Sequence, residues 1–145
     1  MYKHILVATD GSELSETAIE QAVALADALK SKLTVLTVIR PWHAIAPAEV
    51  MVAFPEEEYR KGVEAAARKY LSVAVDAAQA KGIACEPLWV VQERPWEAII
   101  ATAEEKGCDL IVMGSHGRSG LTALFVGSET QKVLAHGKFP VLVCR

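Results

Sequence analysis

Five short apolar segments alternate with helical patterns along this 145-residue chain, and this alternation limits the folds available to it. The segments cover residues 4–9, 32–39, 86–91, 109–114 and 140–144. Most are rich in β-branched residues with few polar ones between them, which is typical of parallel strands buried on both faces. Strands separated by helices form right-handed βαβ units, so helices cover both faces of the sheet. The pattern predicts one α/β domain over residues 1–145, doubly wound and three-layered.

The helical patterns have recognisable start and stop signals. They cover residues 13–30, the stretch from Pro55 to Lys81-Gly82, the stretch from Pro95 to Lys106-Gly107, and Ser128 to about Gly137. Pro87 places the third strand at an edge of the sheet, since proline cannot donate to a neighbouring strand. Residues 40–54 carry the weakest pattern and are expected to form a surface loop or short irregular helix, either a plain connection or a flap over a site.

Composition narrows the class of protein. The net charge of −3 argues against a nucleic-acid partner, whose binding surface is usually basic. No apolar run approaches the roughly 20 residues that span a bilayer, and the first residues do not resemble a signal peptide, so we expect a cytoplasmic protein without a membrane partner. The three cysteines, Cys85, Cys108 and Cys144, lack disulfide or metal-site spacing and are expected to be buried structural thiols.

Ligands of doubly wound sheets bind beyond the carboxyl ends of the strands, where the strand order reverses. Thr9 and Asp10 follow the first segment, and a glycine-rich stretch, GSHGRSGLTALFVGS, begins at the end of the fourth. It is neither GxxxxGK[ST] nor GxGxxG, and the chain has no GxSxG or HExxH motif and no histidine spacing for a metal. Neither catalytic nor metal-ligating residues are assigned.

The glycine-rich stretch has two interpretations. Glycines let backbone N–H groups approach a ligand closely, the helix start at Ser128 attracts anions, and Arg118 adds a cation, which together favour a phosphate site. Alternatively, Ser128 and Gln131 form a capping box, Asp10 caps the first helix, and Arg118 is a solvated charge. The two interpretations are compatible, because a cap leaves other N–H groups available.

Several stretches resemble the universal stress protein family. They are HILVATDGSELSETAIEQA at the start, DLIVMGSHGRSGL and GSETQKVL around the glycine-rich stretch, and FPVLV near the end. The most specific resemblance is the spacing Gly114-x-x-Gly117, nine residues, then Gly127-Ser128. This spacing resembles the nucleotide-binding motif of the family's ATP-binding branch.

The resemblance implies an adenine nucleotide alpha-hydrolase-like fold, with a parallel sheet in the order 3-2-1-4-5. It also implies ATP across the carboxyl ends of strands one and four, with Mg²⁺ or Mn²⁺ held mainly by phosphate oxygens and water. Thr9 and Asp10 would line the adenosine side, Val38 would meet adenine through its backbone, and Met113 and Gly114 would pass beneath the nucleotide. The residues around the phosphates would be Gly117, Arg118, Gly127, Ser128, Glu129 and Thr130. Homodimers would form through the final strand, residues 140–144.

Two residues depart from the family's usual pattern. Glu129 stands where many members have a small or aliphatic residue, and a carboxylate near phosphates is repulsive. Glu93 stands where many have glycine. AMP or ADP therefore remain alternative ligands to ATP.

The resemblance implies a nucleotide-dependent stress sensor or regulator with at most slow ATP hydrolysis. Two alternatives stay open. One is a dimeric interaction module that binds no nucleotide. The other is an adenylylating enzyme, although the pyrophosphate loop SGGxDS that such enzymes carry is missing.

Overall fold

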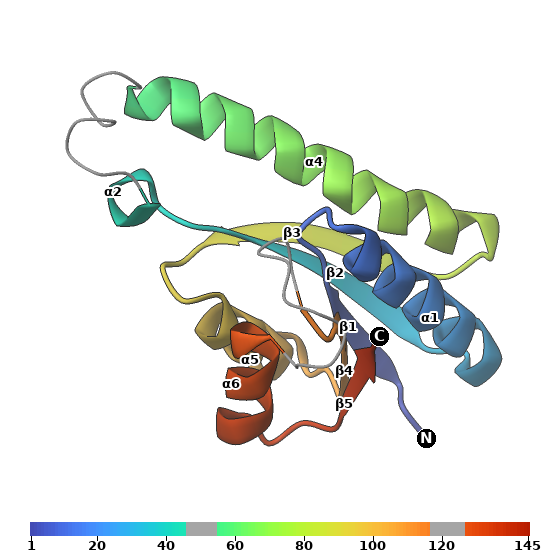
Figure 1. Cartoon of the computed structure of the whole chain (residues 1–145). Coiled ribbons are helices and arrows are strands. Elements are labelled where there is room, and N and C mark those ends of the chain that lie inside the picture. The colour runs from blue at the N-terminus through green and yellow to red at the C-terminus, as the bar shows by residue number, and fades with distance from the viewer. Residues whose placement is uncertain (46–54, 117–126) are drawn as a thin grey trace.

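The sheet contains five parallel strands in the order β3-β2-β1-β4-β5, which confirms the predicted topology (Figure 1). The computed structural model describes residues 1–45, 55–116 and 127–145. The strands are β1 (His4–Ala8), β2 (Lys32–Ile39), β3 (Cys85–Val91), β4 (Leu110–Gly114) and β5 (Val141–Cys144). Their limits lie within one residue of the predicted segments, because the buried apolar runs and the strands coincide.

Helices cover both faces of the sheet, as predicted (Figure 1). Helices α1 (Glu13–Leu29) and α4 (Glu56–Ala80) pack on the face that carries Ile5 and Val7. Helices α5 (Pro95–Lys106) and α6 (Ser128–His136) pack on the face that carries Leu6 and Ile111. Successive side chains of a strand point to opposite faces, so β1 contributes to both cores. A four-residue helix, α2 (Trp42–Ile45), lies in the weakly patterned stretch 40–54, of which residues 46–54 lie outside the described ranges.

The strand order reverses between β1 and β4. From β1 the chain passes outward through β2 to β3, then returns to the other side of β1 for β4 and β5. The connections after β1 and β4 therefore leave the carboxyl edge of the sheet in opposite directions. This divergence opens a crevice at the place where ligands bind in doubly wound folds.

The start of α6 differs from the predicted capping box. Gly127, not Ser128, is the N-cap, and no side chain caps the helix. Gly127 has an extended backbone and its N–H donates to the carbonyl of Ser115, whereas Ser128 is exposed in the first turn. The prediction is wrong because the contact with Ser115 moves the cap one residue earlier.

The hypothesis that Asp10 caps α1 is also wrong. Ser12 is the N-cap, and its hydroxyl accepts a hydrogen bond of 3.2 Å from the N–H of Ser15. Asp10 instead accepts from the N–H of Ser12 at 3.0 Å, in the turn that precedes the helix. Its carboxylate therefore shapes the turn at the end of β1.

The cysteines are free thiols, and two of them are buried as predicted. Burial raises the pKa of Cys108 to about 11 and that of Cys144 above its usual value. Cys85 is only partly buried, since β3 is an edge strand, yet burial raises its pKa to about 11 as well. All three thiols are thus protonated at neutral pH. Across the described ranges, no helix combines the length and apolar character needed to cross a membrane.

Candidate functional site

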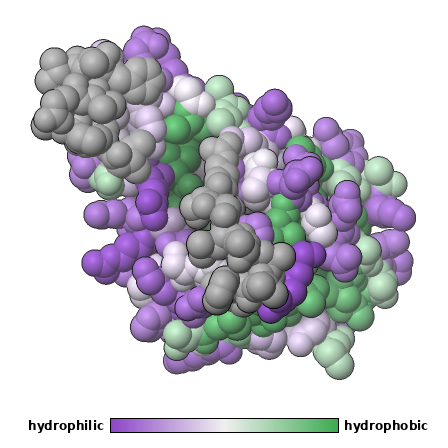
Figure 2. All heavy atoms as spheres, in the orientation of Figure 1, coloured by the Kyte–Doolittle hydropathy of each residue, from purple (hydrophilic) through white to green (hydrophobic). Residues whose placement is uncertain are grey.

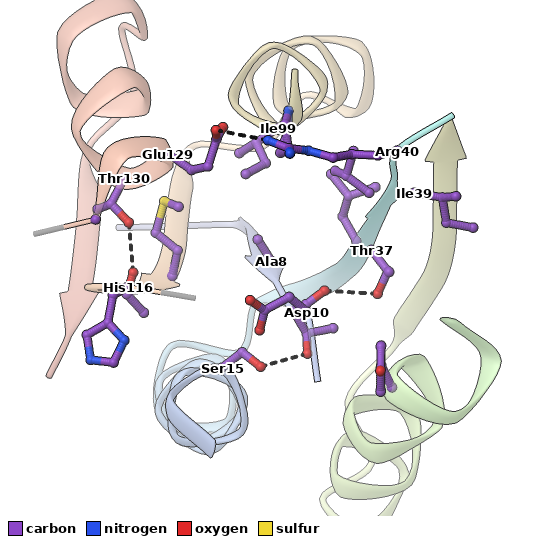
Figure 3. A pocket seen from close by; sticks show the side chains of 18 of the residues that line it. Ala8, Asp10, Ser15, Thr37, Ile39, Arg40, Ile99, His116, Glu129 and Thr130 are labelled. Carbon is purple, nitrogen blue, oxygen red and sulfur yellow. Dashed lines mark hydrogen bonds and ion pairs between the residues drawn. The ribbon is translucent and has the colours of Figure 1, made fainter. Parts of the chain in front are cut away.

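A pocket of about 500 Å³ lies beyond the carboxyl ends of β1, β2 and β4 (Figure 3). Its floor comes from residues at the ends of these strands, including Ala8, Leu36, Val38 and Met113. Helix α4 contributes one wall through Tyr59, Val63, Ala66 and Tyr70, and the first turns of α5 and α6 contribute the other. The volume suits a small-molecule ligand, because such sites usually measure about 300–1,000 Å³.

The structure brings most of the predicted site residues together around this pocket. Its lining includes Thr9, Asp10, Val38, Met113, Gly114, Gly127, Ser128, Glu129 and Thr130. Gly117 and Arg118 lie outside the described residues. Residues far apart in the sequence thus meet at one edge of the sheet, as the strand-end argument expects.

Sequence reasoning missed the wall made by α4. In the sequence, the spacing of Tyr59, Val63 and Tyr70 predicts only the buried face of an amphipathic helix. They do share one face, but the amino-terminal half of that face borders the pocket. The signal was the pair of tyrosines, since a phenol places a polar group at the edge of an apolar face. Arg40, at the end of β2, also lines the pocket and was not among the predicted site residues.

The turn after β1 is fixed by hydrogen bonds around Thr9. The Thr9 hydroxyl lies 3.1 Å from that of Ser15, and the Thr9 carbonyl accepts from the Thr37 hydroxyl at 3.0 Å (Figure 3). The N–H of Gly11 donates to the Thr9 hydroxyl at 3.3 Å. These bonds, with that from Ser12 to Asp10, hold the Asp10 backbone at the pocket edge.

Gly11 has a second constraint besides this hydrogen bond. Its φ of +81° is in the left-handed region, which favours glycine. A Cβ on Gly11 would overlap the ring of Tyr70 from α4. The glycine therefore allows α4 to approach the end of β1 and to form a wall of the pocket.

The two described ends of the glycine-rich stretch are in contact. Besides the hydrogen bond from Gly127 to Ser115, a Cβ on Gly127 would lie 3.0 Å from the Cα of His116. A Cβ on Gly114 would lie 3.0 Å from Cγ of Leu14. The buried Thr130 hydroxyl donates to the Gly114 carbonyl at 2.8 Å and ties α6 to the end of β4. Close packing within the protein thus accounts for both glycines, independently of any ligand.

Glu129 points across the pocket rather than toward its own helix start. Its Oε2 accepts a hydrogen bond of 2.9 Å from the N–H of Trp96, in the first turn of α5. Its Oε1 lies 3.9 Å from Nη2 of Arg40 (Figure 3). A carboxylate at a helix N-terminus is favourable, since the helix dipole is positive there. The carboxylate that departs from the family's usual pattern therefore has partners in the first turn of α5 and at Arg40, directly after β2.

Arg40 is held by its backbone as well as by this ion pair. Its carbonyl accepts a hydrogen bond of 2.5 Å from the hydroxyl of Tyr59. Burial raises the pKa of Tyr59, so the phenol stays protonated and can donate at neutral pH. The side chain of Arg40 remains 52% exposed, which leaves the guanidinium at the mouth of the pocket.

The described residues offer no ready-made metal site. Among them, no group of three or more His, Cys, Asp or Glu side chains is placed to hold a metal ion. A cation accompanying a ligand here would depend on the ligand and water for most of its coordination.

The sequence profile of the universal stress protein family matches residues 1–145. The chain belongs to this family. Universal stress protein YxiE of Bacillus subtilis is 36% identical over 149 aligned residues, and the alignment covers all of both chains.

Solved structures of family members have the same fold. MJ0577 of Methanocaldococcus jannaschii has a TM-score of 0.85 and 31% identity, with 99% of this chain and 96% of that chain covered. A universal stress protein in complex with cAMP has a TM-score of 0.71 and 29% identity, with 98% and 95% covered. Family members of this fold thus include one that was solved with an adenine nucleotide.

Proposed function

We infer that this protein binds an adenine nucleotide in the pocket, ATP together with Mg²⁺ or Mn²⁺, and acts as a nucleotide-dependent regulator in the cytoplasm. The observation that carries this proposal is the convergence of the predicted site residues on one pocket of about 500 Å³ at the topological switch point. The related structure with cAMP supports the class of ligand.

The lining fits the parts of a nucleotide. Leu36, Val38, Ile99 and Met113 give an apolar region suited to a flat base, whose polar edge would meet the backbone of Val38. Thr9 and Asp10 lie where ribose hydroxyls would find acceptors. The first turn of α6 presents N–H groups that suit phosphate oxygens, because no side chain caps that helix. Gly117 and Arg118 belong to the proposed phosphate site through the sequence motif alone.

The proposed role is regulation rather than catalysis. Phosphoryl-transfer sites usually position a lysine and a residue that orients the nucleophile. No lysine lines the described part of the pocket, and Asp10 accepts a hydrogen bond from its own turn. Hydrolysis is therefore expected to be slow at most. The bound cation would neutralise phosphate charge, and the protein's own residues would bind and orient the nucleotide.

An interaction module that binds no nucleotide is the second candidate. Packing alone accounts for Gly114 and Gly127, so these glycines do not require a ligand. β5 is an edge strand with Leu142 39% exposed, and pairing of two such edges would give the proposed homodimer. On the face shown in Figure 2, hydrophobic side chains gather in several separate patches between hydrophilic ones. The edge strand is therefore a better candidate for self-association than a broad apolar surface on this face.

The two candidates differ in their response to nucleotide. The test is thermal unfolding of the purified protein with 5 mM ATP and MgCl₂, with GTP as the control, combined with native mass spectrometry. A Kd a thousandfold below the ligand concentration would stabilise the fold by about 4 kcal/mol. We expect a rise in Tm with ATP and a smaller one with GTP. A Tm that ATP leaves unchanged, in a protein that is dimeric by mass, would support the interaction module instead.

A further inference from the structure

We propose that Glu129 and Arg40 make nucleotide affinity depend on the charge of the phosphates, an arrangement that we call a charge filter. The pocket accepts ATP as its Mg²⁺ complex but prefers AMP to metal-free ATP. The inference rests on the proposed function. It concerns which charged form of the nucleotide the pocket takes, and it follows from side chains that the nucleotide motif does not include.

The described lining of the pocket carries an excess of negative charge. Among its Lys, Arg, Asp and Glu side chains, Arg40 is positive, and Asp10 and Glu129 are negative. Metal-free ATP carries about two more negative charges than AMP at neutral pH. Each added phosphate charge therefore meets added repulsion from the carboxylates, in a region where partial burial weakens solvent screening.

Glu129 occupies the position from which it can exert this effect. It belongs to the first turn of α6, beside the N–H groups proposed to bind phosphate. The Glu129 side chain is 31% exposed, so its charge is less screened than that of a free surface carboxylate. The hydrogen bond from the N–H of Trp96 holds the carboxylate against the start of α5, in the pocket wall.

Arg40 compensates this charge only in part. The separation of 3.9 Å from Glu129 is long for an ion pair, and the Arg40 side chain is 52% exposed. A phosphate entering the pocket would compete with Glu129 for the same guanidinium. A ligand with more phosphate charge gains more from Arg40 but also meets more repulsion from Glu129, whereas a bound Mg²⁺ reduces the repulsion. The pair thus makes the binding of ATP depend on the cation.

The test is calorimetric titration of AMP, ADP and ATP into the wild type and Glu129→Gln, with EDTA and then with Mg²⁺. Glutamine keeps an oxygen to accept from Trp96 and removes only the charge. We expect wild type with EDTA to bind AMP more tightly than ATP. Relative to the wild type, Glu129→Gln should gain the most affinity for ATP, about tenfold, less for ADP and the least for AMP. Mg²⁺ and high salt should both reduce this gain.

Two further variants make the result specific. Glu93→Gln changes the net charge by the same amount as Glu129→Gln, but Glu93 is exposed and does not line the pocket. The nucleotide affinities of Glu93→Gln should therefore match those of the wild type. Arg40→Gln should weaken ATP more than AMP. Circular dichroism and thermal unfolding would confirm that each variant is folded.

Other outcomes would overturn the filter. An equal gain for AMP and ATP in Glu129→Gln, or no gain, would mean that the carboxylate does not sense phosphate charge. A loss of Mg²⁺-dependent ATP binding in that variant would mean that Glu129 is a ligand of the cation. If no adenine nucleotide binds to the wild type under any condition, the proposed function itself fails and the filter fails with it.

Discussion

At the amino ends of the strands, His4, Thr34 and Asp109 are engaged within the protein, whereas at the carboxyl ends Thr9, Asp10 and Glu129 line a pocket. Nε2 of His4 lies 2.7 Å from the Thr34 hydroxyl, and both residues are buried. Asp109 accepts hydrogen bonds from the backbone N–H groups of Lys3 and His4, at 2.9 and 3.1 Å. The same kinds of residue therefore close one end of the sheet and leave the other open.

Electrostatics at the amino end set the charge of each group. Although burial acts in the opposite direction, hydrogen bonds from the backbone N–H groups of Lys3 and His4 lower the pKa of Asp109, which stays ionised. Burial, followed by the positive charge of Lys32, lowers the pKa of His4. The ring is therefore neutral at pH 7 and shares a hydrogen bond with Thr34 through Nε2, whereas its buried Nδ1 has no hydrogen-bond partner among the described residues. At the carboxyl end, by contrast, the side chains of Asp10, Arg40 and Glu129 line an open cavity. The comparison indicates that topology, rather than residue type, decides which polar clusters become sites.

Replacing Gly11 by alanine would test whether the carboxyl end needs close packing. The left-handed φ and the overlap with Tyr70 together predict a loss of about 2–4 kcal/mol in the free energy of unfolding. Gly82, before β3 at the amino end, is the control, since its φ is +69° and nothing lies near its Cβ. Gly82→Ala should cost only about 1 kcal/mol. Chemical denaturation of both variants measures the difference in the free energy of unfolding. Equal losses would show that the Tyr70 ring can move away from the new Cβ without loss of stability.

A matched pair on β2 would compare the two ends directly. Thr34→Val removes the hydroxyl that contacts His4, and Thr37→Val removes the one that donates to the Thr9 carbonyl. Both hydroxyls are buried, so each variant should lose about 1–2 kcal/mol of stability. Only Thr37 lines the pocket, so only Thr37→Val should also weaken ATP binding, as measured by calorimetry. A similar loss of affinity in Thr34→Val would contradict the separation of the two ends.

The smallest expected effect lies at the junction of α1 and β2. Lys30 has a left-handed φ of 59° at the helix C-cap, where glycine is favoured. Lys30→Gly should therefore stabilise the protein by about 0.5–1 kcal/mol, seen as a higher denaturation midpoint. Lys30→Ala is the control, because it also removes the exposed ion pair with Asp27 but keeps the strain. If Lys30→Gly is no more stable than Lys30→Ala, the left-handed backbone at this helix end carries no strain that glycine relieves.

Much of the fold followed from short-range patterns. The apolar runs predicted all five strands, and Pro87 predicted that β3 is an edge strand. The same patterns placed the start of α6 correctly at Ser128 but not its N-cap, because Gly127 becomes the cap through its contact with Ser115. Local signals are reliable where neighbours in the sequence decide the structure, and they fail where a distant contact competes with them.

The sequence alone determined the strand order expected from the family resemblance, the edge of the sheet at which a ligand would bind, and most of the residues that meet there. Tertiary structure alone decided that α4 supplies a wall and that the carboxylate of Glu129 turns toward Trp96 and Arg40. The physical reason is that periodicity reports which side of an element is apolar, whereas the partner of a charge depends on how three separate elements pack at the end of the sheet.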